Sequence, residues 1–279
     1  MQPWVPLAAF ALLAWSFQRL LSKVALKSLT TAKFYLLSAA VSLIVYGPYL
    51  LFRPPAARDL IPALGLACLM AVTFWVTTEA IRRGPLGVVS PITALSPALT
   101  AILAITLIGE RPGVLAYAGI ALAPVGVALL SARGGRPDGC VGAWIALAIA
   151  SLLLQGFGAF IAKLVVTPAG PSALLLAGAG VQVIVGLALA PPWRWKREDL
   201  RGRPALYTVI AYAIAGMATI GYLSALATGP AAVVVPLVSA SPALAGVLGL
   251  LVLKEKVGRP QLAGLAVALV GASLLATAG

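Results

Sequence analysis

The fold is decided by a stretch that the chain carries twice: GPLGVVSPITALSPALTAILAITLIGE at 84–110 and GPAAVVVPLVSASPALAGVLGLLVLKE at 229–255. A shift of 145 residues aligns 84–130 with 229–275 without a gap, and 20 of the 47 pairs are identical. The identical pairs with particular backbone or charge roles are Gly84/Gly229, Pro85/Pro230, Pro91/Pro236, Ser96/Ser241, Pro97/Pro242, Glu110/Glu255, Gly119/Gly264 and Gly126/Gly271. Composition alone would not align these residues, so the chain is an internal duplication.

The composition is that of a membrane protein. Of the 279 residues, 61% are hydrophobic and only 10% are charged, and the mean hydropathy is +1.04. This apolar excess excludes a soluble enzyme. The net charge of +13 falls in short clusters between apolar runs, so it indicates membrane orientation and not a nucleic-acid-binding face. The chain has no histidine and two cysteines, Cys68 and Cys140, so we expect no metal, haem or other cofactor.

Apolar runs of membrane-spanning length recur along the whole chain. A bilayer core about 30 Å thick needs roughly 20 helical residues. The runs of that size are Val5–Leu26, Lys33–Phe52, Leu60–Ile81, Leu86–Ile108, Gly113–Leu130, Val141–Val166, Ser172–Ala190, Pro204–Ala227, Ala231–Leu253 and Gln261–Thr277. The sequence therefore predicts an all-α polytopic membrane protein with ten transmembrane helices.

The duplication organises these helices into two copies. A looser match at a shift of 140 pairs the first span with the sixth through Phe17/Phe157 and Lys23/Lys163. We predict a first five-helix repeat at 1–133, a linker at 134–140 and a second repeat at 141–279. Because five is odd, the second copy enters the membrane from the opposite face, which makes the repeats inverted.

The Lys and Arg residues between spans favour one orientation. With Arg19, Lys23 and Lys163 set aside as intrahelical, the odd-numbered loops hold fourteen cations and the even-numbered loops hold three. Since positive loops stay on the cytoplasmic side, we predict that both termini lie outside the cell (inner) membrane. Alternatively, some of these charges pair with lipid phosphate or carboxylates and carry no topological information.

The repeated motifs resemble those of a known family. They are Leu-Leu-Ala-Trp-Ser-Phe at 12–17, the Gly-Pro to Ser-Pro-Ala run at 84–98, and Gly-Glu-Arg-Pro at 109–112. The sequence is similar to the EamA-type ten-helix exporters of the drug/metabolite transporter (DMT) superfamily. This resemblance implies a transporter, not an enzyme, that exports amino acids or related metabolites.

The first span carries a costly cation on a polar face. A charged side chain at a helix centre costs about 2.5–3.5 kcal/mol on insertion scales, so Arg19 is first considered functional. Trp15, Gln18, Arg19 and Ser22 follow the spacing of one helix face. We expect this face to point into the bundle, where Arg19 could bind a carboxylate or phosphate. Lys163 is nearer a helix end, and we expect its ammonium to reach the lipid headgroups.

Three acidic residues have candidate roles. Glu79 is the only partly intramembrane carboxylate, so it is the candidate for proton coupling, and the alternative is a structural pair with Arg82. Glu110 and Glu255 each open a helix, where the dipole favours a carboxylate, so we expect a structural role. The alternative for these two is a gating contact.

Further candidates complete a predicted central cavity lined mainly by spans one, three, four, six, eight and nine. The substrate-binding candidates on other spans are Trp75, Gln155, Phe157, Gln182, Tyr212 and Tyr222. Matched prolines interrupt spans four and nine and are candidate hinges, namely Pro91, Pro97, Pro236 and Pro242. Alternatively, nearby serines satisfy the freed carbonyls and the kinks only allow packing. Trp4, near a helix end, is expected to be an interfacial anchor.

These features predict a secondary transporter, an exporter or exchanger, of small organic metabolites. Amino acids or related zwitterions are the expected substrates, moved by alternating access around the cavity between the repeats. The alternative is a translocator of a lipid-linked or phosphorylated metabolite, and a channel or a non-transporting scaffold are more distant alternatives. The expected partners are a small-molecule solute and the lipid bilayer, without nucleic acid, and monomer and homodimer both remain open.

Overall fold

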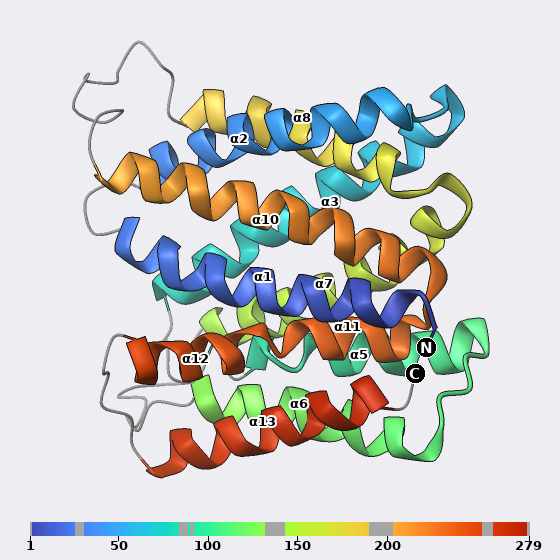
Figure 1. Cartoon of the computed structure of the whole chain (residues 1–279), viewed down its shortest axis with the longest axis vertical. Coiled ribbons are helices and arrows are strands. Elements are labelled where there is room, and N and C mark those ends of the chain that lie inside the picture. The colour runs from blue at the N-terminus through green and yellow to red at the C-terminus, as the bar shows by residue number, and fades with distance from the viewer. Residues whose placement is uncertain are drawn as a thin grey trace.

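Helices are the only regular elements in the part of the chain that the computed structural model describes, which is 2–25, 31–83, 89, 92–131, 143–189, 203–252 and 259–277 (Figure 1). The elements are α1 (Trp4–Ala25), α2 (Thr31–Phe52), α3 (Ala57–Arg83), α5 (Ser96–Leu103), the π-helical turn η1 (Ala104–Ile108), α6 (Val114–Ser131), α7 (Ala143–Ala169), α8 (Pro171–Leu189), α10 (Arg203–Thr228), α11 (Ala231–Ser239), α12 (Ser241–Val252) and α13 (Arg259–Thr277). Each predicted span has its counterpart, the fourth in α5 with η1 and the ninth in α11 with α12. The prediction of an all-α, ten-span fold is confirmed.

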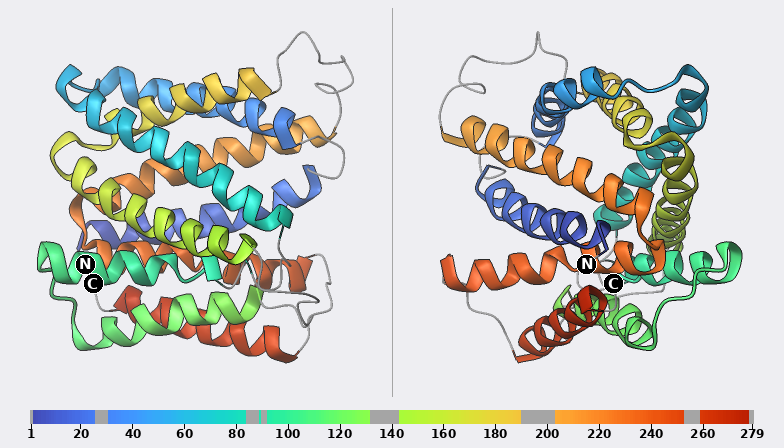
Figure 2. Two further views of the ribbon diagram at one scale, coloured as in Figure 1. Left: turned by 180° about the vertical axis from the view of Figure 1, so that it is seen from behind. Right: turned by 45° about the vertical axis from the view of Figure 1, so that its right-hand side comes forward.

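The helices lie side by side and run roughly along one direction, as expected for spans that cross one bilayer (Figures 1 and 2). By length and composition alone, four described stretches could cross a membrane: Ala57–Thr77, Trp144–Ala169, Pro171–Leu189 and Ala205–Thr228. Shorter apolar helical stretches are Leu36–Phe52, Ser96–Ile108, Val114–Leu129, Ala231–Ala245 and Gln261–Thr277. The N- and C-termini lie together at one end of the bundle, which we call the terminal end (Figure 1).

The two halves pack with an internal symmetry. With α1, α2, α3, α5 and α6 matched to α7, α8, α10, α12 and α13, the contacts between the halves occur in equivalent pairs. Thus α1 packs on α10 as α7 packs on α3, and α1 packs on α12 as α7 packs on α5. Trp4 at the start of α1 and Lys163 near the end of α7 both contact Gly229, so these equivalent helices run in opposite directions.

Spans four and nine are broken at equivalent positions. Leu95 has φ −85° and ψ −5°, and its repeat counterpart Ala240 has φ −76° and ψ 0°. The bonds around the breaks also match, because Leu95 N donates to Ile92 O and Ala240 N donates to Leu237 O, each at 3.2 Å. A proline follows each break by two residues, in the first turn of the next helix, where its missing N–H has no helical acceptor to lose.

Of the predicted hinge residues, Pro97 and Pro242 therefore begin new helices and do not kink continuous ones. Pro236 lies inside α11, and Pro91 lies outside the described residues. Hydroxyl groups bond the backbone carbonyls that follow the breaks: Ser16 Oγ donates to Ser241 O at 3.1 Å. Ser16 belongs to α1 and is not one of the serines near the prolines, so satisfaction of the freed carbonyls by those serines stays a prediction.

Small residues let α6 and α13 approach closely. A Cβ atom on Gly126 would overlap the backbone of Ala268, and one on Gly271 would overlap the backbone of Ala123. Gly126 and Gly271 are counterparts in the duplication. The helix pair is therefore a symmetric crossing that keeps the last span of each repeat together, away from the cavity described next.

Candidate substrate cavity

A cavity of about 550 Å³ lies between the two repeats. The first repeat lines it from α1, α3 and α5, and the second lines it from α7, α8, α10 and α11. Its volume falls in the range of small-molecule sites, about 300–1,000 Å³. The sequence-based expectation placed the cavity mainly among other spans and named only Gln182 on the seventh, whereas α8 contributes Leu174, Gly178, Val181 and Gln182.

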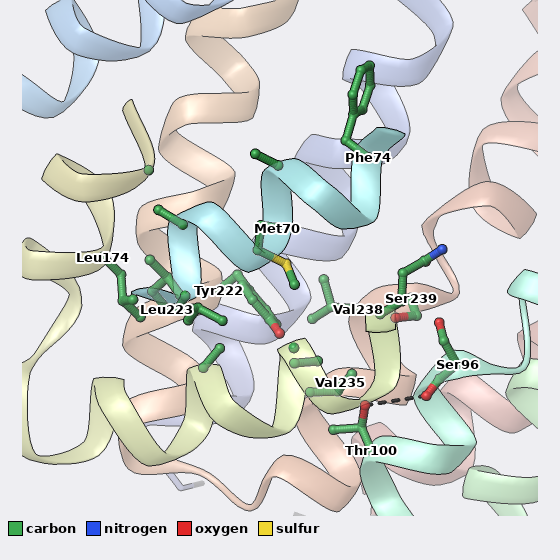
Figure 3. A pocket seen from close by; sticks show the side chains of 18 of the residues that line it. Met70, Phe74, Ser96, Thr100, Leu174, Tyr222, Leu223, Val235, Val238 and Ser239 are labelled. Carbon is green, nitrogen blue, oxygen red and sulfur yellow. Dashed lines mark hydrogen bonds between the residues drawn. The ribbon is translucent and has the colours of Figure 1, made fainter. Parts of the chain in front are cut away.

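The walls of the cavity are mainly apolar. Met70 and Phe74 on α3 and Tyr222 and Leu223 on α10 line it, and Figure 3 shows the side chain of Met70 directed toward Tyr222. Trp15 on α1 stacks at a tilt on Tyr222, with ring centroids 5.3 Å apart and planes at 44°. These rings come from opposite repeats, so their contact joins the two halves at the cavity.

The broken spans supply hydroxyl groups to the cavity. Ser96 lies just after the break in span four, and Ser239 lies just before the break in span nine (Figure 3). Thr100 Oγ1 donates to Ser96 O at 3.3 Å and to Gly156 O at 2.9 Å, which ties α5 to α7. The breaks therefore place polar backbone and side-chain groups beside the solute space.

A second polar group enters from α7. Gln155 Nε2 donates to Ser151 Oγ at 2.9 Å and to Thr77 Oγ1 at 3.4 Å. The hydroxyls of Thr77 and the fully buried Ser151 lie 2.5 Å apart. Because these bonds hold its amide nitrogen, Gln155 presents a fixed side chain at the cavity wall.

The structure brings four of the predicted substrate-binding residues to the cavity wall, namely Trp15, Gln155, Gln182 and Tyr222, and the hinge candidate Pro97 also lies there. The other predicted binding residues, Gln18, Arg19, Trp75, Glu79, Phe157 and Tyr212, are not among the lining residues. Trp75 is 50% exposed and Phe157 is 43% exposed on the outer surface.

Arg19 instead contacts the second broken span. Its Nε donates to Ser241 Oγ at 3.3 Å, while Ser16 on the same helix binds the carbonyl of Ser241. Ser241 is the first residue of α12. Arg19 therefore ties α1 to the break in span nine. Ser22, the last member of the predicted polar face, has no described side chain.

Glu79 forms an ion pair within its own helix. Its carboxylate accepts from Arg83 Nε, four residues further on, and both side chains are partly exposed near the end of α3. The structural pair expected from the sequence thus involves Arg83, and the side chain of Arg82 lies outside the described residues. The surroundings of Glu79 place it at the bundle surface rather than at the cavity.

Two expectations about residues at the terminal end are wrong in detail. Lys163 does not extend toward headgroups, because its Nζ donates to Leu226 O at 2.8 Å and Gly229 O at 2.7 Å, at the end of α10. Trp4 is not a surface anchor, because it is 2% exposed and packs against Gly229. The tertiary fold provides acceptors and a pocket that helix position alone does not reveal.

Glu110 caps a helix of the other repeat and not the helix that follows it. Its Oε1 and Oε2 accept from the N–H groups of Ala231 and Ala232, each at 2.8 Å, in the first turn of α11. Gly109, with φ 75°, turns the chain out of η1 and places Glu110 there. The counterpart Glu255 lies outside the described residues.

The apolar lining residues were not predicted. Leu66, Met70, Leu174, Val235 and Val238 resemble residues on every other span, so periodicity could not select them. A weak signal was available in the small residues, because Gly158, Ala159 and Ala162 on α7 leave the room that the cavity occupies.

The fold, the inverted duplication and the cavity between the repeats define a polytopic membrane protein of the inverted-repeat transporter class. The model of the EamA-like transporter family matches residues 2–132 and 142–277. The chain belongs to this family, whose members are secondary transporters of small metabolites and not enzymes.

The comparison with solved structures addresses the fold alone. A solved structure described as "Crystal structure of protein" matches with a TM-score of 0.78 at 17% identity, over 97% of this chain and 95% of its own. No curated protein matches the chain. The family match therefore establishes a membrane transporter without naming its solute.

Proposed function

We propose that this protein moves a small metabolite without net charge, specifically an amino acid with an apolar side chain or a related zwitterion, by alternating access at the cavity between the repeats. The observation that carries the proposal is the chemistry of the wall. Among the described lining residues, the polar groups are hydroxyls, amides and an indole, and no side chain is ionised. A net charge in this low-dielectric site would lack a partner, whereas a neutral amphipathic solute would not.

The broken spans favour a zwitterion over a simple apolar solute. The cavity borders the N-terminus of α5 through Ser96 and Pro97, and the C-terminus of α11 through Val238 and Ser239. Helix dipoles give the first end a partial positive charge and the second a partial negative charge. A carboxylate near α5 and an ammonium near α11 would therefore each meet a favourable potential, while the aromatic wall at Trp15 and Tyr222 takes the side chain.

The same cavity wall disfavours the alternative substrate, a lipid-linked or phosphorylated metabolite. A phosphate group is best bound by Arg or Lys side chains, which make charge-assisted hydrogen bonds to it. Arg19, the cation that could have served, binds Ser241 and is not among the lining residues. The role proposed for Arg19 is therefore to hold the break in span nine, through which it influences the cavity without touching the solute.

The proposal is tested by efflux from proteoliposomes loaded with one mixture of neutral amino acids, acidic amino acids, nucleosides and sugar phosphates, read by mass spectrometry. We expect selective loss of neutral amino acids with apolar side chains. A protein-free vesicle and a variant with a filled cavity, Gly178→Phe, are the controls. Selective loss of sugar phosphates or of acidic amino acids would contradict the proposed substrate class, and retention of every solute would contradict transport of this mixture.

A pH gradient in the same assay addresses coupling. Since Glu79 pairs with Arg83 outside the cavity, we expect Glu79→Gln to leave the pH dependence of efflux unchanged. A facilitated carrier or exchanger driven by the solute gradient would behave in this way. Loss of gradient sensitivity in Glu79→Gln would instead return this carboxylate to the transport mechanism.

A further inference from the structure

Two charged side chains from different elements bracket the junction between α10 and α11. The ammonium of Lys163, on α7, binds the carbonyl of Leu226, in the last turn of α10, and that of Gly229, just after α10. The carboxylate of Glu110, after η1, binds N–H groups in the first turn of α11. The two side chains carry opposite charges and bind backbone groups on either side of the junction. We call Lys163 and Glu110, with the backbone groups that they bind, the junction clamp.

The junction clamp complements both helix ends. Carbonyls at a helix C-terminus favour a cation, and N–H groups at a helix N-terminus favour an anion. Pro230, the N-cap of α11, makes no side-chain capping bond. The backbone groups at the α10–α11 junction thus depend on side chains of neighbouring elements, one from each repeat.

The junction clamp lies directly behind the cavity. Leu223 lines the cavity one turn before the clamped carbonyl of Leu226, and Val235 lines it one turn after the clamped N–H of Ala231. Trp4, at the start of α1, packs against Gly229 between these points. The elements that meet at the junction therefore cover the cavity on the side of the terminal end.

The contacts in the junction clamp can also be exchanged. Lys163 and Glu110 are partly exposed, whereas Leu226 and the first turn of α11 are buried. When charged side chains leave backbone groups at a boundary with water, water replaces both sets of hydrogen bonds, so the net free-energy change is much smaller than the strength of the bonds. Such contacts can therefore hold the cavity closed toward the terminal end and still break and re-form in each transport cycle.

We propose that Lys163 and Glu110 are positioning residues that close the cavity toward the terminal end and release the α10–α11 junction each time the cavity opens to that side. The inference rests on the proposed alternating access. It assigns the clamp to one of the two states of the transport cycle. Weakening the clamp should therefore shift the population toward the state that is open at the terminal end.

Cysteine accessibility tests this proposal without any solute. The native cysteines are first removed, as Cys68→Ser and Cys140→Ser, and Ala162→Cys or Ser96→Cys is introduced as a single reporter in the cavity wall. A membrane-impermeant maleimide is added to intact cells or to inverted vesicles. The face of the terminal end is the face from which Arg53→Cys, exposed between α2 and α3, is labelled.

In Lys163→Met and Glu110→Gln we expect labelling from the face of the terminal end to become about tenfold faster or more. Each substitution removes charge-assisted hydrogen bonds that form only in the state closed toward the terminal end. Labelling from the opposite face should slow in the same variants. Lys163→Arg retains the cation and should label like the parent. Arg58→Met removes an exposed cation at the same end and is the matched control, expected to have no effect.

Thermal unfolding of each variant distinguishes a gate from a helix cap. A lower melting temperature with unchanged labelling from both faces would overturn the proposal and leave a purely structural cap. Glu110→Gln keeps the size of the side chain and one acceptor oxygen, so it provides a folded variant if Lys163→Met does not fold. A failure of the substrate proposal leaves these labelling rates unaffected, so the two failures are distinguishable.

Discussion

Filling the cavity from Gly178 should stop transport without harming the fold. Gly178 lines the cavity from α8, and a Cβ atom built on it meets no neighbouring atom within 4 Å. Gly180 on the same helix has equally open surroundings but does not line the cavity. Two residues correspond to about 200° around a helix, so the two positions present opposite faces. Substitution by Ala, Leu and Phe at each position separates the effect of filling the cavity, at Gly178, from the effect of replacing a glycine in α8, at Gly180.

The expected magnitudes follow from these surroundings. Replacing a helical glycine removes conformational freedom from the unfolded chain, so Gly178→Ala and Gly180→Ala should each raise stability by about 0.5–1 kcal/mol. A side chain that competes with the solute for space should cost binding about 1–3 kcal/mol, which is roughly 5- to 150-fold in affinity. Efflux should therefore fall stepwise from Gly178→Ala to Gly178→Phe and stay within about twofold of the parent across the Gly180 series.

The assay is initial-rate efflux from proteoliposomes at several solute concentrations, with thermal unfolding measured on the same preparations. The cavity assignment would be refuted if Gly178→Phe were folded and transported its solute at the parental rate. Equal losses in the two series would likewise show that α8 tolerates no substitution, and that the effect does not arise from filling the cavity.

Three further outcomes are expected. Gly126→Ala should lower the free energy of unfolding by about 1–3 kcal/mol, because its Cβ would overlap the backbone of α13. Gly65→Ala, in the open surroundings of α3, should not lower it, and thermal unfolding of both variants checks this. Arg19→Met and Ser241→Ala should be non-additive in efflux, with a coupling of about 0.5–3 kcal/mol in a double-mutant cycle, and additive effects would remove the tie between them. Arg53→Cys should be labelled by an impermeant maleimide from outside intact cells, and labelling only in inverted vesicles would reverse the predicted orientation.

The cavity residues show where prediction from the sequence succeeds. Trp15, Gln155, Gln182 and Tyr222 stand out because a polar or amphipathic side chain in mid-span is costly unless it faces protein. Arg19 carries the same signal and yet binds Ser241, since sequence shows that a buried cation needs a partner but not which partner it finds. The lining leucines and valines carry no signal, because lipid and a cavity wall both accept apolar side chains.

The sequence by itself determined the spans, the duplication and its inversion, since these follow from the length of apolar runs, from residues that repeat at a fixed shift and from the odd number of helices per copy. The positions of Pro97 and Pro242 also indicated where spans four and nine are interrupted. Only the tertiary structure decided that Glu110 caps α11 and that Lys163 caps α10. These contacts join residues more than 60 positions apart, and their geometry depends on how the two repeats cross, which no local pattern encodes.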